Sequence, residues 1–148
     1  MKKITTYLLF CALLIFSGFT SVAQTSEKKP ELLTKETFIK KVWNFVESPN
    51  EFKYLGDKPC IIDFYADWCG WCKKIAPFFE EFSNTYAGQI YVYKVNADQQ
   101  GELKALFQAK YLPTIAFIPM KGKPTVIQGA QSKEQFEQYI QQILLNKK

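Results

Sequence analysis

Residues 61–72 read IIDFYADWCGWC, an apolar run that ends in two cysteines separated by two residues. The run Ile61–Ala66 is typical of a short buried strand, and a helical pattern of apolar residues begins at the cysteines. The N-terminus of a helix has unpaired N–H groups and a dipole that stabilise an anion. Cys69 at that position is expected to form a thiolate readily, the species that attacks disulfides. A Cys-x-x-Cys pair can also ligate a metal, but the preceding strand favours a redox dithiol.

The composition limits which functions are open to the chain. It has 148 residues, of which 47% are hydrophobic and 16% aromatic, and a formal net charge of +5. This predicts one globular domain with a substantial core. All basic residues are lysines and they are dispersed, so we expect no nucleic-acid partner. The absence of histidine excludes Cys-His and Ser-His catalytic pairs and imidazole zinc sites, and we expect no metal and no cofactor.

Residues 1–23 have the pattern of a secretory signal peptide. Met1–Lys3 is positively charged, Tyr7–Phe16 is apolar, and Ser21–Ala23 is a small-residue cleavage site, so we expect cleavage before Gln24. The apolar stretch is shorter than the ~20 residues of a membrane-spanning helix, which makes a permanent anchor the second interpretation. The chain is therefore expected to be exported to the periplasm or another extracytoplasmic space, where disulfides form.

The rest of the chain divides into a short tether and one domain. Residues 24–30 are polar and are interpreted as a flexible tether, and residues 31–148 as the folded domain. The mature chain would keep three cysteines, which allows at most one internal disulfide. Cys60, at the start of the buried strand, is interpreted as a small apolar core residue, with a regulatory thiol as the alternative. No sustained heptad repeat is present, so we expect a monomer.

Hydrophobic periodicity in the domain predicts alternating helices and strands. The predicted order αβαβαββα implies a mixed sheet with helices on both faces. The predicted elements are a helix after Thr34 that includes Phe38, Val42, Phe45 and Val46; a strand at Cys60–Ala66; a helix from Cys72 to about Tyr86, kinked at Pro77; a strand at Ile90–Val95; a helix from Gly101 to about Lys110; a strand at Thr114–Ile118; an edge strand at Pro124–Gln128; and a last helix capped by Ser132.

Over residues 31–145 the chain resembles the thioredoxin family. Asp63–Lys73 is similar to the active-site stretch of that family, Lys94–Asp98 to the end of its next strand, and Leu112–Thr114 to its cis-proline loop. Two further matches, in the same order, are Ile75-Ala76-Pro77 and Gly129-Ala130. The resemblance implies an α/β thioredoxin fold and an exported bacterial thiol–disulfide oxidoreductase. Trp71 is a departure, because thioredoxin itself has a proline between its cysteines.

The resemblance also implies separate roles for the catalytic residues. Cys69 would attack a substrate disulfide, and Cys72, one helical turn later, would resolve the mixed disulfide and close a Cys69–Cys72 bridge. Asp63 stands in an otherwise apolar strand, so we expect it to be buried with a raised pKa. By resemblance it would relay the proton of Cys72. Lys94 resembles the family lysine that lies near this aspartate, although an ordinary surface lysine is an equal interpretation.

A second group of residues is expected to bind substrate. Trp68 and Trp71 flank the first cysteine and are interpreted as a contact surface. By resemblance Pro113 is cis and leaves the Leu112 backbone free to pair with an extended substrate segment. The full predicted groove for flexible protein segments is mostly apolar and consists of Trp68, Gly70, Trp71, Leu112, Pro113, Gly129 and Ala130.

The direction of electron flow is inferred from the two residues between the cysteines. Gly70-Trp71 offers no positive charge to stabilise the thiolate, which favours a reducing or intermediate potential and a reductase of protein disulfides. An exported reductase needs electrons from a partner, by analogy a membrane thiol transporter. The alternatives are a cytochrome c maturation or disulfide-isomerase-type relative, a non-catalytic thioredoxin-fold binding protein, and a metal-binding Cys-x-x-Cys.

Overall fold

The structure is a computed structural model that describes residues 27–147. The predicted signal peptide lies outside the described residues, as does the start of the predicted tether. In the described part of the tether, the Lys28 N–H donates to Asn84 Oδ1 at 2.9 Å, and Asn84 Nδ2 donates to the Lys28 carbonyl at 3.0 Å. This segment therefore contacts the domain directly.

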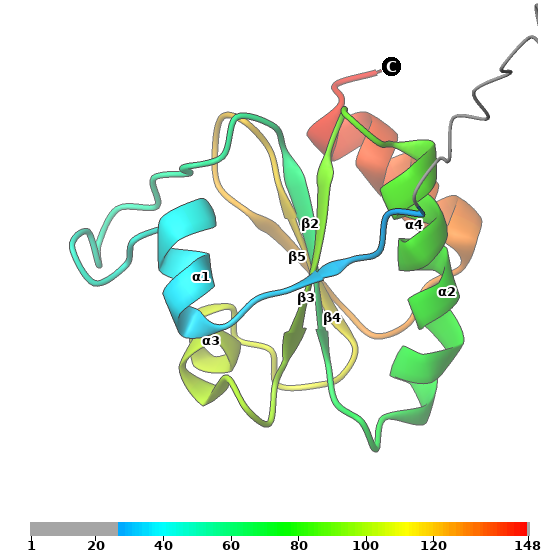
Figure 1. Cartoon of the computed structure of the whole chain (residues 1–148), viewed down its shortest axis with the longest axis horizontal. Coiled ribbons are helices and arrows are strands. Elements are labelled where there is room, and N and C mark those ends of the chain that lie inside the picture. Colours follow the sequence, from blue (N-terminus) through cyan, green and yellow to red (C-terminus); the bar gives the residue numbers. More distant parts are fainter. Residues whose placement is uncertain (1–26, 148) are drawn as a thin grey trace, which may run out of the picture.

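A mixed sheet forms the centre of the domain, as predicted, and it has five strands rather than the four of the predicted order (Figure 1). Its strand order is β1-β3-β2-β4-β5. Both β1 and β2 run parallel to β3, whereas β4 runs antiparallel to β2 and to β5. The strands are β1 (Glu31–Leu32), β2 (Cys60–Tyr65), β3 (Tyr91–Asn96), β4 (Thr114–Ile118) and β5 (Thr125–Gln128).

Helices cover both faces of this sheet (Figure 1). One face carries α1 (Lys35–Lys41) and α3 (Gly101–Leu106), and the other carries α2 (Gly70–Thr85) and α4 (Lys133–Tyr139). A π-helical segment, η1 (Ile140–Leu144), continues α4. No helix among residues 27–147 is long and apolar enough to cross a membrane.

The pleat of β2 divides the core into two clusters. Ile62 and Phe64 pack with residues of α1 and α3, while Ile61 packs with residues of α2 and α4. Successive side chains of a strand point to opposite faces, so Asp63 shares the face of Ile61, which α2 covers. The alternation therefore places the one acidic residue of β2 beneath the helix that carries the cysteines.

The first predicted helix is wrong in its length. α1 ends at Lys41, and Val46 is 61% exposed in a later turn. Phe45 is still buried, with its ring centroid 6.1 Å from that of Phe38 and 5.9 Å from that of Trp43. Leaving the helix lets Trp43 and Phe45 enter the same core cluster, and this packing outweighs the helical periodicity.

Other element bounds also differ from the predictions. α2 begins at Gly70 rather than Cys72 and continues through Pro77. α3 ends at Leu106 rather than near Lys110, and Gln108 has a φ of 50°, a left-handed conformation that a helix cannot contain. The two-residue strand β1 is absent from the predicted order because so short an edge strand leaves no periodic signal.

The mixed topology gathers three loops at one end of the sheet. The parallel strands β2 and β3 end there, and β4 begins there because it is antiparallel to β2, with Phe64 opposite Thr114. This end is the lower one in Figure 1. Three loops are therefore neighbours: those before α2, before α3 and before β4. In the sequence, about 30 residues separate the first loop from the second, and about 15 separate the second from the third.

Candidate active site

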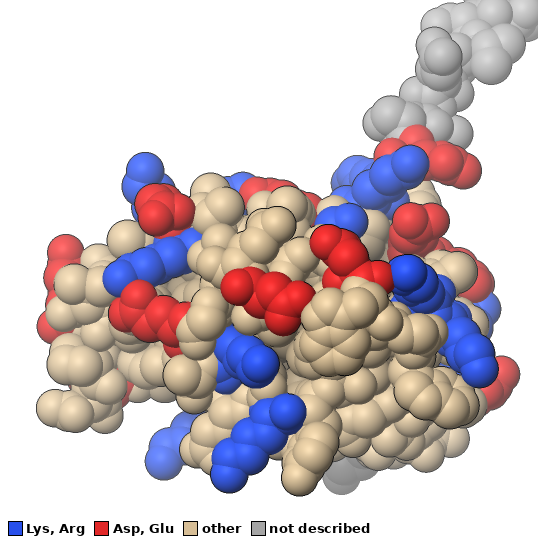
Figure 2. Space-filling view, turned by 90° about the horizontal axis from the view of Figure 1, so that it is seen from below, with Lys and Arg blue, Asp and Glu red and all other residues tan. Residues whose placement is uncertain are grey.

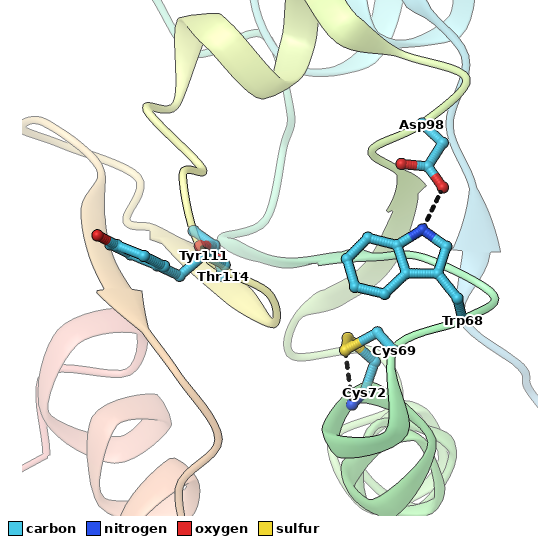
Figure 3. Close-up of a disulfide and its surroundings, with 6 residues drawn as sticks. All are labelled: Trp68, Cys69, Cys72, Asp98, Tyr111 and Thr114. Atoms are coloured by element: carbon cyan, nitrogen blue, oxygen red, sulfur yellow. Dashed lines mark hydrogen bonds between the residues drawn. A yellow bond between two sulfur atoms is a disulfide. The ribbon is translucent and has the colours of Figure 1, made fainter.

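The two cysteines of the motif form a disulfide at the start of α2. Cys69 is the N-cap residue of α2, and the Cα atoms of Cys69 and Cys72 are 5.3 Å apart. The Cys69 Sγ accepts a hydrogen bond from the Cys72 backbone N–H at 3.1 Å (Figure 3). The first turn of α2 has no acidic residue. Helix N–H groups and the helix dipole therefore act on this sulfur without an opposing carboxylate in that turn.

Both cysteines are buried. Cys69 is 5% exposed and Cys72 is 2% exposed. They pack with Ala66 in a small cluster that Tyr65 and Leu112 border. A substrate sulfur must therefore enter between the surrounding loops to reach Cys69.

Asp63 is buried, as predicted. It is 5% exposed, and its Oδ1 has no hydrogen-bond partner in the described part of the chain. Burial raises the pKa of Asp63 to about 7, and the charge of Lys94 opposes this rise. The carboxyl group is thus balanced between its neutral and charged forms near neutral pH.

Lys94 is placed opposite Asp63 in the sheet. The two residues are Cα partners in the parallel pair of β2 and β3. Among residues 27–147 they form no ion pair within 4.0 Å, and the Lys94 Nζ lies 5.7 Å from the centroid of the Tyr65 ring. Lys94 therefore acts on Asp63 through its charge rather than through a direct bond.

Trp68 is exposed but held in place. Its side chain is 71% exposed, and its Nε1 donates to Asp98 Oδ2 at 2.7 Å (Figure 3). Asn96 supports this contact, because its Oδ1 accepts the Asp98 backbone N–H at 3.0 Å and its Nδ2 donates to Asp67 at 3.4 Å. The end of β3 thus fixes the tryptophan next to the first cysteine.

Trp71 has a different support. It is 61% exposed, and the Lys74 Nζ lies 4.2 Å from a ring centroid of its indole, a cation–π contact. Gly70, between Cys69 and Trp71, is the first residue of α2 and is exposed. The two residues between the cysteines are therefore both open to a partner.

The predicted cis-proline loop is confirmed in its geometry. The Leu112–Pro113 peptide bond is cis, and Leu112 packs against the cysteine cluster. The Pro113 carbonyl accepts the Gly129 N–H at 2.8 Å, and Gly129 has a φ of 89°, where a side chain is unfavourable. The Thr114 Oγ1 donates to the Tyr111 carbonyl at 2.5 Å. These bonds hold the loop on both sides of the proline.

Ala130 and Cys60 contribute to the packing of the domain. Ala130 packs against the core cluster of α2 and α4. Cys60 is a free, fully buried thiol whose pKa burial raises to about 12, which agrees with its interpretation as a core residue. Within residues 27–147 no group of three or more His, Cys, Asp or Glu side chains could hold a metal ion.

Sequence reasoning missed four residues of this site. Asp98 and Asn96 support Trp68, and Lys74 contacts Trp71. Tyr111, 71% exposed, borders the cis-proline loop. The parallel arrangement of two strands that end at one edge could have placed Asp98 near Trp68, but nothing in the sequence marks Tyr111.

The surface around the disulfide combines exposed aromatic side chains with charged ones. Figure 2 faces the end of the molecule where the three loops meet, and it shows uncharged surface interrupted by lysine and carboxylate side chains. Trp68, Trp71 and Tyr111 are three of the large apolar or aromatic side chains that the described chain leaves exposed. Such a surface at a reactive site is typical of a contact area for another protein.

Comparisons with known proteins agree with this geometry. The family model described as Thioredoxin matches residues 31–142. A thioredoxin of Borreliella burgdorferi is 43% identical over 108 residues, which cover 73% of this chain and 92% of the relative. A thioredoxin of Alicyclobacillus acidocaldarius is 41% identical over 91 residues, which cover 60% of this chain and 85% of the relative.

A solved structure shares the fold. It is that of chloroplastic thioredoxin z, with a TM-score of 0.62, 24% sequence identity, and coverage of 78% of this chain and 95% of that one. The order of strands, the disulfide at the start of α2 and the match over most of the chain lead to one conclusion. The chain belongs to the thioredoxin family and is a thiol–disulfide oxidoreductase.

Proposed function

We propose that this protein is an exported reductase of protein disulfides that acts through the Cys69-Gly70-Trp71-Cys72 dithiol. The observation that carries the proposal is the position of the Cys69–Cys72 disulfide, at the N-terminus of α2 and beside the cis-proline loop. The helix terminus supports the thiolate of a nucleophile, and the loop supplies a backbone to which a substrate can bind.

The reaction follows from the positions of the two cysteines. In the reduced protein, the Cys69 thiolate attacks one sulfur of a substrate disulfide, and the other substrate sulfur leaves as a thiolate that takes up a proton. The Cys72 thiolate then attacks Cys69 Sγ in the mixed disulfide and releases the second substrate thiol. Two electrons and two protons pass to the substrate, and the Cys69–Cys72 disulfide is left behind.

Asp63 is the proposed proton acceptor for Cys72. Cys72 must lose a proton before it can attack, and it is too deeply buried to give that proton directly to bulk water. Asp63 lies on the face of the sheet beneath α2, and its pKa of about 7 suits it to accept and return a proton near neutral pH. Lys94 is proposed to tune this pKa through its charge.

Substrate binding is assigned to the loop before β4 and to the exposed tryptophans. Leu112 has no hydrogen bond through its backbone N–H or carbonyl within residues 27–147. An extended substrate segment can therefore pair with it by strand addition while its cysteine enters towards Cys69. Trp68, Gly70, Trp71, Pro113, Gly129 and Ala130 complete the proposed contact area.

The sequence pattern of residues 1–23 supports export with cleavage before Gln24. Outside the cytoplasm the oxidised protein needs a membrane-bound thiol donor to restore its dithiol. N-terminal sequencing of the protein recovered from the periplasm of an expressing bacterium should find Gln24 as the first residue. A mature chain that begins at Met1 and stays with the membrane would support the anchored alternative.

The activity is tested by reduction of insulin with dithiothreitol as electron donor. Wild-type protein should accelerate the precipitation of insulin chains, and Cys69→Ser should reduce the rate to that of dithiothreitol alone. Cys60→Ala is the matched control, because it removes a thiol that the proposed cycle does not use. Equal rates for wild type and Cys69→Ser would instead support a non-catalytic binding protein.

The direction of electron flow is tested by equilibration with glutathione. The uncharged Gly70-Trp71 pair supports a reducing or intermediate potential, of about −270 to −200 mV, and a value of about −120 mV would make the protein an oxidant. Trapping with Cys72→Ser, which should stall the mixed disulfide on Cys69, would identify the substrates. If the wild-type protein reduces insulin but the Cys72→Ser variant traps no protein partner, small-molecule disulfides would be the substrates instead.

A further inference from the structure

We propose that Tyr111 determines substrate specificity by contacting an apolar side chain directly next to the attacked cysteine in an extended polypeptide. This inference rests on the proposed function. It adds a preference for particular residues around the substrate cysteine. Cys69 and Cys72 react with the disulfide itself and do not distinguish between such residues. Its first support is that Tyr111 is 71% exposed and its hydroxyl makes no hydrogen bond within residues 27–147.

The backbone of Tyr111 is fixed although its side chain is free. Its carbonyl accepts a hydrogen bond from the Thr114 Oγ1 at 2.5 Å, and Thr114 is fully buried at the start of β4. The following residue, Leu112, packs against the cysteine cluster. An aromatic side chain on a fixed backbone gives a large contact area with little loss of entropy when a partner binds.

Tyr111 lies across the site from Trp68. Figure 3 shows the disulfide between them, with the Tyr111 ring directed away from the sulfurs and the Trp68 indole next to them. Since Cys69 is only 5% exposed, a substrate must present its cysteine on a narrow, extended segment. The residues on one side of that cysteine then pass over the loop that carries Tyr111.

The alternation of side chains gives the position of the contact. Leu112 points towards the cysteine cluster, whereas Tyr111 is exposed. A substrate strand that pairs with the free backbone of Leu112 and directs its cysteine inward presents the neighbouring side chains outward. Side chains on one face of paired strands lie close together, so an outward residue near the cysteine meets Tyr111.

The experiment uses two symmetric peptide dimers, each joined by one central disulfide. The peptides carry either leucine or serine at the position directly before and the position directly after the cysteine, with the same terminal lysines for solubility. Reduced full-length protein is mixed with each dimer in a stopped-flow instrument, and the second-order rate constant for reduction of the dimer is compared as a ratio, leucine over serine. We expect a ratio of about fivefold for wild type and near one for Tyr111→Ala.

Two variants and one small substrate make the test selective. Tyr111→Phe should keep the wild-type ratio because it keeps the ring, and Val46→Ala should keep it because Val46 is exposed in the turn after α1. Reduction of hydroxyethyl disulfide, which has no flanking residues, should be equal in wild type and Tyr111→Ala.

An unchanged ratio in Tyr111→Ala would overturn this inference and leave the reductase function intact. Failure of wild type on all three substrates would overturn the proposed function itself.

Discussion

Cys60 and Cys69 are nine positions apart, the first at the start of β2 and the second in the loop that follows it, and both are almost completely buried. Cys60 begins the strand within the apolar core, where burial raises the pKa of its thiol to about 12. Cys69 follows the strand as the N-cap of α2, where its sulfur accepts a backbone N–H. The comparison teaches that burial alone does not decide the reactivity of a cysteine here. What differs is the set of dipoles that face the sulfur.

The largest expected effect is on alkylation of the reduced protein. At pH 7 iodoacetamide should label Cys69 at least about 1,000-fold faster than Cys60, because Cys60 has almost no thiolate and no access to reagent. Peptide mass spectrometry of quenched samples gives both rates. Cys69→Ser should leave Cys60 unlabelled in native protein and labelled in guanidinium chloride. Similar native rates for the two cysteines would remove the basis of the comparison.

The next effect concerns Asp63, the buried carboxyl group of β2, which lies between Cys60 and Cys69 in the sequence. Its pKa rises from 3.8 to about 7 on folding, so the folded state binds its proton more strongly than the unfolded state does. The stability of the oxidised protein should therefore fall as pH rises from about 4 to about 7, by about 4 kcal/mol, and then become constant for this group.

Asp63→Asn should abolish this fall and be more stable than wild type at pH 8. Urea unfolding measured at several pH values between 4 and 8 gives the free energy of unfolding for both. Asp67→Asn is the matched control, since Asp67 is exposed in the following loop. A wild-type profile parallel to that of Asp63→Asn would contradict the raised pKa.

A smaller effect is expected from charge beside Cys69. Trp71 carries no charge, so Trp71→His should add a cation near the start of α2, stabilise the thiolate and raise the reduction potential by about 30 mV. Equilibration with glutathione, followed by acid quenching and mass analysis, measures the potential. Trp71→Gln is the neutral control, and an equal shift in both variants would show that the loss of the indole, rather than the added charge, is responsible.

The sequence predicted those parts of the site that depend on local pattern. The strand and helix around the cysteines, the burial of Asp63 and the cis-proline loop all follow from short motifs, and the structure agrees with each. The length of α1 was not predictable, because Trp43 and Phe45 reach the core only after the chain leaves the helix. Packing between distant segments decided that boundary.

The supports of the exposed aromatic residues were missed for a related reason. The bond from Trp68 to Asp98 joins residues 30 positions apart, and it exists because β2 and β3 are parallel and end at the same edge. The contact of Lys74 with Trp71 depends on the rotamers of two exposed side chains. Neither the register of a sheet nor a surface rotamer is encoded in a local motif.

The smallest expected effect separates the recognition surface from the reactive sulfur. Asp98→Ala removes the 2.7 Å hydrogen bond to Trp68, while the helix terminus at Cys69 is unchanged. The freed indole then loses more entropy when a protein substrate binds, so kcat/KM on insulin should fall about fivefold. Hydroxyethyl disulfide reduction and the alkylation rate of Cys69 should stay as in wild type, and Asp98→Asn should be intermediate because its amide oxygen can still accept the bond. A parallel loss on both substrates would mean that Asp98 acts on the Cys69 sulfur itself, and not only through the position of Trp68.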